Sequence, residues 1–105
     1  MAEYWAEVFI ELLPTASGGR QAPIDLNNDH PGSYRPHLRV MGGSGEMLGV
    51  AFMDGPDEPV YPGENTHATI QGLYSGVSYH EMVEGAQFEI LEGARAVGTG
   101  RVVRV

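Results

Sequence analysis

Residues 86–105, AQFEILEGARAVGTGRVVRV, carry the clearest fold signal in this chain. Residues 87–90 alternate polar and apolar side chains, which is the period of a half-buried β-strand. Residues 92–95 follow, and Gly93 can adopt the positive φ that a tight hairpin turn requires. Residues 96–105 are rich in valine and predict a second strand, ordered by pairing with the first. The end of this sequence is therefore predicted to form a β-hairpin.

Two glycines interrupt the second strand of this hairpin. Gly98 and Gly100 are two residues apart, so they lie on the same face of a strand. A strand face without side chains allows the backbone to bend sharply or another chain to approach closely. We expect one of these two features at this place.

The N-terminal part of the chain predicts a strand at residues 4–13. Tyr4, Ala6, Val8, Ile10 and Leu12 fall on one face, and glutamates are among the residues on the other. The β-branched and aromatic residues favour a strand over a helix. Further strands are predicted at residues 36–41, 46–53 and 66–74, with a short extended piece at residues 60–61 and a weaker strand or a connector at residues 77–83.

Turns and loops occupy much of the remaining chain. Residues 14–33 predict a long loop with the turn dipeptides Gly18-Gly19 and Pro31-Gly32, and residues 54–65 are also rich in turn residues. The 15 glycines and 7 prolines favour short strands over helices, and no stretch sustains a period of 3.6 residues. The sequence predicts an all-β protein, a closed barrel or a sandwich, in one domain over residues 1–105.

The composition narrows the functional classes. The net charge is −8, all six basic residues are arginine, and an acidic surface repels nucleic acid at long range. No cysteine is present, and neither a signal peptide nor a membrane-spanning run is recognised, so we expect a cytoplasmic location.

The usual catalytic and metal-binding patterns are not found in the sequence. Residues 42–45 (GGSG) lack the lysine of a phosphate-binding loop, so no GTP site is expected. His67 and His80 could meet in space, but scattered histidines are more often spectators than metal ligands. The acidic turn at residues 54–58 is interpreted as solvated. We expect no enzyme activity and no cofactor.

Several short motifs have an order that is known from one protein family. They are EVFI (7–10), GGR (18–20), Pro23, YRP (34–36), PGEN (62–65), EGAQFEI (84–90) and LEGARAVGTGRVV (91–103). Together they resemble the third, C-terminal domain of translation elongation factor Tu, over residues 7–105. The resemblance implies a six-stranded antiparallel closed β-barrel. The family's nucleotide-binding domain has no counterpart in this sequence, so GTP binding is not implied.

The resemblance also implies a partner-binding face. In the family, a Glu-Gly pair of the last hairpin approaches the T stem of tRNA, and Glu92 and Gly93 match that pair. Arg35, His37 and Arg95 complete the predicted face. Two positions depart from the family, because Leu91 replaces an arginine and His37 replaces a glutamine. A simpler interpretation of Glu92 and Gly93 is a hairpin turn.

Two functions are consistent with these features of the sequence. The first is a non-catalytic binding module that engages a component linked to translation, with a protein favoured over tRNA because of the net charge of −8. The alternative is a structural protein that self-associates through its barrel surface and has no role in translation. The loop at residues 21–33 and the acidic turn at residues 54–58 are further candidate contact regions.

Overall fold

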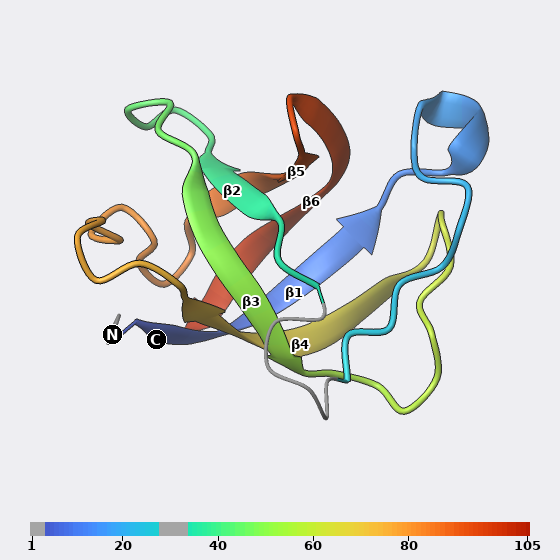
Figure 1. Cartoon of the computed structure of the whole chain (residues 1–105), viewed down its shortest axis with the longest axis horizontal. Helices are drawn as coiled ribbons and strands as arrows, with labels where there is room; N and C mark the ends of the chain where they lie inside the picture. Colours follow the sequence, from blue (N-terminus) through green and yellow to red (C-terminus); the bar gives the residue numbers. More distant parts are fainter. Residues whose placement is uncertain (1–3, 28–33) are drawn as a thin grey trace.

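The computed structural model describes residues 4–27 and 34–105 as a closed barrel of six antiparallel strands (Figure 1). The strands are β1 Trp5–Leu12, β2 His37–Val40, β3 Leu48–Asp54, β4 Asn65–Gly72, β5 Gln87–Glu92 and β6 Arg95–Arg104. A single 3-10 turn, η1 Thr15–Ser17, is the one helical element among the described residues. The predicted all-β barrel is confirmed. Across the described ranges, no helix has the length and apolar character needed to cross a membrane.

The strand order around the barrel is β1-β4-β3-β2-β5-β6, and every strand is paired on both sides. The predicted C-terminal hairpin is confirmed, with Glu92 paired to Arg95 and Gly93 at a φ of 64° in the turn between them. Strand β6 also pairs with β1, which closes the barrel. Closure removes the free sheet edges that would otherwise invite aggregation.

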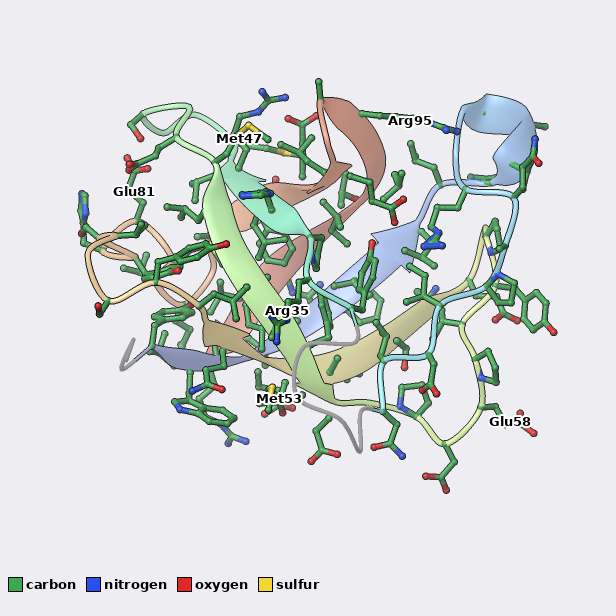
Figure 2. The ribbon with its side chains drawn as sticks, in the orientation of Figure 1. Arg35, Met47, Met53, Glu58, Glu81 and Arg95 are labelled. Carbon is green, nitrogen blue, oxygen red and sulfur yellow. The ribbon has the colours of Figure 1, made fainter. Side chains whose placement is uncertain are left out.

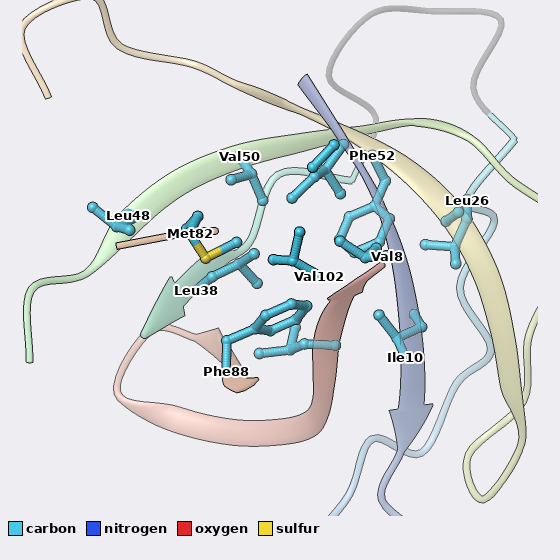
Figure 3. Close-up of a cluster of buried hydrophobic side chains, with 14 of the residues drawn as sticks. Val8, Ile10, Leu26, Leu38, Leu48, Val50, Phe52, Met82, Phe88 and Val102 are labelled. Atoms are coloured by element: carbon cyan, nitrogen blue, oxygen red, sulfur yellow. The ribbon is translucent and has the colours of Figure 1, made fainter. Parts of the chain in front are cut away.

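The interior of the barrel is filled with apolar side chains (Figure 3). Four alternating residues of β1, Ala6, Val8, Ile10 and Leu12, are buried as their pattern predicted. Large side chains from other strands, such as Phe52 on β3, complete the core. Small barrels are typically filled in this way.

The two glycines of β6 allow a close approach of strands. A Cβ atom on Gly98 would lie 2.7 Å from the carbonyl oxygen of Glu11, and one on Gly100 would lie 2.6 Å from that of Phe9. The ring of Phe88 also lies 2.7 Å from the Cβ position of Gly100. Both glycines therefore face the interior, where the β1 backbone and the Phe88 ring occupy the space that a side chain would need.

The segment between β4 and β5 is a connector of turns rather than a strand. Its Tyr79 is buried, and the Tyr79 hydroxyl donates to the carbonyl of Gly49 at 2.7 Å and accepts from the backbone N–H of Leu73 at 3.1 Å. The Tyr79 ring also lies against Gly72, where an added Cβ would meet it at 2.8 Å. The Tyr79 side chain, together with the backbone hydrogen bonds of Gly85 and Ala86 with Val102, thus holds this connector on the barrel.

Part of the long loop packs onto the barrel. Ile24 and Val60 each donate a backbone hydrogen bond to the other. The extended piece predicted at residues 60–61 therefore pairs with this part of the loop. Leu26 is fully buried. Asn27 donates through Nδ2 to Oδ1 of Asp57 at 3.3 Å, which links this loop to the acidic turn. Residues 28–33, which complete the loop, lie outside the described residues.

Candidate partner-binding site

A cluster around Glu92 lies at the end of the barrel that carries the β5–β6 turn. We call this the hairpin end. Arg20 Nη1 donates to Glu92 Oε2 at 2.9 Å, and the Tyr34 hydroxyl donates to the same oxygen at 2.7 Å. The guanidinium carbon of Arg20 also lies 5.7 Å from the centre of the Tyr34 ring. The side chains of Arg20 and Glu92 are 23% and 35% exposed. The Glu92 carboxylate is therefore bound from within the chain.

This cluster joins three of the motifs on which the family resemblance rests. Arg20 ends GGR, Tyr34 begins YRP, and Glu92 belongs to LEGAR. The sequence analysis predicted Glu92 as a contact residue but assigned no role to Arg20 or Tyr34, although both stood in the quoted motifs. Burial, followed by the hydrogen bond to Glu92, raises the pKa of Tyr34 well above its ordinary value. The hydroxyl thus remains a donor throughout the physiological range.

Arg95 is engaged in a similar way. Its Nη2 donates to the carbonyls of Gly18 at 2.8 Å and Gly19 at 2.6 Å, and its Nε donates to Gly18 at 3.2 Å. Figure 2 shows Arg95 reaching from the hairpin towards the η1 loop. A loss of binding in an Arg95 variant would therefore not by itself place a partner there, because this loop would also be disturbed.

The five predicted contact residues are only partly brought together. Glu92, Gly93 and Arg95 form the hairpin turn, and His37 pairs with Leu91 in the β2–β5 ladder. Arg35 is exposed beside the start of β2 and is separated from Arg95 in Figure 2, although its neighbour Tyr34 belongs to the cluster around Glu92. A binding role for this set stays a prediction.

The opposite end of the barrel carries most of the exposed large apolar side chains. The start of β1, β3 and β5 and the end of β2, β4 and β6 lie at this end, because neighbouring strands are antiparallel. Six of the seven exposed large apolar residues of the described chain flank these strand ends, and the seventh, Tyr61, lies at the hairpin end. We call the six the apolar end: Trp5, Met41, Met47, Tyr74, Val83 and Val105. Sequence reasoning missed it, because each residue is isolated in the chain.

A groove of about 570 Å³ opens on the apolar end, and its mostly apolar lining consists of Tyr4, Tyr79, His80, Met82, Val83, Glu84 and Val105. The rings of Tyr4 and Tyr79 stack with centres 5.3 Å apart. The Tyr4 hydroxyl donates to the carbonyl of Met82 at 2.8 Å. Two anchored tyrosines and a buried methionine therefore line the groove.

Tyr4 provides a test of this packing. Burial raises the pKa of the Tyr4 phenol from 10 to about 12. Since the folded-state pKa is the higher one, the stabilisation is complete below pH 10 and is lost as pH rises towards 12. We expect the free energy of unfolding to fall over this window, and to fall less in Tyr4→Phe. Urea unfolding at pH 8, 10 and 11.5 would measure the change. Equal slopes for the two proteins would contradict the burial of the phenol.

Two of the segments that build the apolar end are acidic. Residues 41–47 and 73–87 contain Glu46, Glu81 and Glu84 and no arginine or lysine. Glu81 accepts hydrogen bonds from the Ser44 backbone at 3.0 Å and from the Ser44 hydroxyl at 3.0 Å, so it ties the glycine-rich connection to the β4–β5 connector. Glu46 and Glu84 remain exposed.

Among residues 4–27 and 34–105, the histidines and acidic residues do not form a further site. In the part of the chain that the structure describes, no three histidine, cysteine or acidic side chains are grouped so as to hold a metal ion. His67 packs against Phe9 at 5.0 Å between ring centres, and His80 lies 2.7 Å from the Ser78 hydroxyl. No protein-family model matches the sequence.

Proposed function

We propose that this chain is a non-catalytic binding module that engages a protein partner. The observation that carries the proposal is the mostly apolar groove at the apolar end, with the exposed Val83 and Val105 on its rim, in a barrel whose interior is filled. A contiguous exposed apolar surface marks an interaction site, whereas apolar residues exposed singly are ordinary. The resemblance to the C-terminal barrel of elongation factor Tu suggests a partner linked to translation, in the cytoplasm.

Electrostatics supports a protein over tRNA as this partner. Phosphate binding depends on basic groups that replace counterions. At the hairpin end, Arg20 is paired with Glu92 and Arg95 is bonded to Gly18 and Gly19. Both guanidinium groups are thus already hydrogen-bonded within the chain. The net charge of −8 also opposes the approach of RNA.

Self-association through the barrel surface is the second candidate, and the same apolar end favours it. If two copies met end to end, however, Glu46 and Glu84 of one copy would approach those of the other. Like charges facing each other across an interface suppress association. We therefore rank a different protein above a second copy.

A pair of matched variants tests the proposal. Val83 at the apolar end and Tyr61 at the hairpin end are 55% and 54% exposed, so an aspartate at either position is expected to leave folding intact. We expect Val83→Asp to lose the protein that the immobilised wild type captures from a lysate of its source cells, and Tyr61→Asp to retain it.

Two further measurements separate the alternatives. We expect light scattering to give the mass of a monomer for the wild type. A dimer that Val83→Asp abolishes would instead favour self-association. Fluorescence anisotropy with labelled tRNA at physiological salt should show weak binding. Tight tRNA binding, or equal capture by Val83→Asp and wild type, would overturn the proposed function.

A further inference from the structure

We infer that the groove beside Tyr4 and Val83 receives a large apolar side chain from a basic amphipathic segment of the partner, with a lysine or arginine of that segment beside Glu84. This inference rests on the proposed function and adds the chemistry of the partner. Three features support it: the groove is already formed, its shape suits an apolar side chain, and acidic residues surround it.

The groove is already formed in the free chain. The Tyr4 hydroxyl is held by the Met82 carbonyl at 2.8 Å, and the Tyr79 hydroxyl by the Gly49 carbonyl at 2.7 Å. The two rings stack at an angle of 15°. Because these side chains are ordered before binding, the partner does not have to pay the entropy of arranging them.

The shape of the groove suits an apolar side chain. Met82 and Tyr79 are 1% and 8% exposed, whereas Val83 and Val105 on the rim are 55% and 67% exposed. The volume of about 570 Å³ lies within the ordinary range of binding pockets. An inserted leucine, methionine or aromatic side chain would cover the two valines and contact the tyrosine rings.

The charge around the groove selects a cationic partner. Glu84 lines the groove, and the segments that form this end contribute Glu46 and Glu81 as well. Arg104, which precedes the groove residue Val105 in the chain, is paired with Glu7 at 2.6 Å. A nucleic acid, an anionic membrane or a second copy of this end would bring further negative charge. A protein segment that combines apolar and basic residues has the complementary character.

The probe is a designed 14-residue amphipathic peptide of leucine and lysine, compared with a leucine–glutamate peptide of the same pattern and a glycine–serine–lysine peptide of equal charge. Isothermal titration calorimetry measures the affinities, and the fluorescence of the single tryptophan, Trp5, is followed alongside because Val105 lies beside both Trp5 and the groove. We expect the leucine–lysine peptide to bind at least 10-fold more tightly than either control peptide.

Four variants locate the site. Val83→Asp and Glu84→Lys should each weaken binding of the leucine–lysine peptide at least 10-fold, and Glu84→Lys should improve binding of the leucine–glutamate peptide. Tyr61→Asp and Glu58→Lys, exposed changes of the same kinds at the hairpin end, should leave both affinities unchanged. Thermal unfolding of all four variants checks that they remain folded.

Each contrary result has a distinct meaning. Equal binding of the two leucine peptides, or an unchanged preference in Glu84→Lys, would overturn the basic character of the partner. Peptide binding that survives Val83→Asp would overturn the location in the groove. If no peptide binds but the lysate partner is still lost in Val83→Asp, this inference fails while the proposed function stands.

Discussion

Gly100→Ala is expected to lower the free energy of unfolding by about 3 kcal/mol, at the upper end of what overpacking costs. The added methyl group would lie 2.6 Å from the Phe9 carbonyl oxygen and 2.7 Å from Cζ of the Phe88 ring. The ring can shift a little, but the oxygen cannot move without separating β1 from β6, the pair that closes the barrel. Urea unfolding followed by circular dichroism would measure the change.

Gly76→Ala is the matched control. No atom lies within 4 Å of its Cβ position, and its φ is not in the left-handed region. Such a substitution reduces the entropy of the unfolded chain, so stability should stay the same or rise by about 0.4–1 kcal/mol. If the two alanine variants had equal stability, the close approach of β6 to β1 would be wrong.

Glu92→Ala is expected to cost about 2–3 kcal/mol, because it leaves two other groups without their partner. Arg20 would lose its counter-charge, and its buried Nε already has no hydrogen-bond partner in the described part of the chain. The Tyr34 hydroxyl would lose its acceptor. The partial exposure of Arg20 and Glu92 keeps the expected cost below that of breaking a fully buried ion pair.

Glu89→Ala on the same strand is the control for this variant. Glu89 also pairs with an arginine, Arg39 at 2.9 Å. The two carboxylates are similarly exposed, at 31% for Glu89 and 35% for Glu92, but Arg39 is 40% exposed and Arg20 only 23%. Exposed pairs contribute roughly 0–1 kcal/mol, so the loss should be small. A Glu92→Ala variant that loses no more than Glu89→Ala would mean that Glu92 is not committed to the fold. That result would favour the role of Glu92 as a partner contact.

The strands and the final hairpin could be predicted because their signals are local. Alternation along β1 assigned Ala6, Val8 and Ile10 to the interior, since successive side chains of a strand point to opposite faces. Gly93 marked the hairpin turn because glycine accepts positive φ without steric cost. The spacing of Gly98 and Gly100 indicated either a sharp bend or a close approach, because both lack a Cβ atom, and the structure shows the close approach.

The sequence by itself thus determined the strands, their turns and the all-β class, whereas the tertiary structure decided which distant residues meet. Arg20 and Tyr34 contact Glu92 across 72 and 58 residues, and nothing near either one in the chain marks that contact. The apolar end exists only because antiparallel closure gathers strand ends from the whole chain. Residue type and spacing govern local conformation directly, but the meeting of remote side chains depends on the path of the entire backbone.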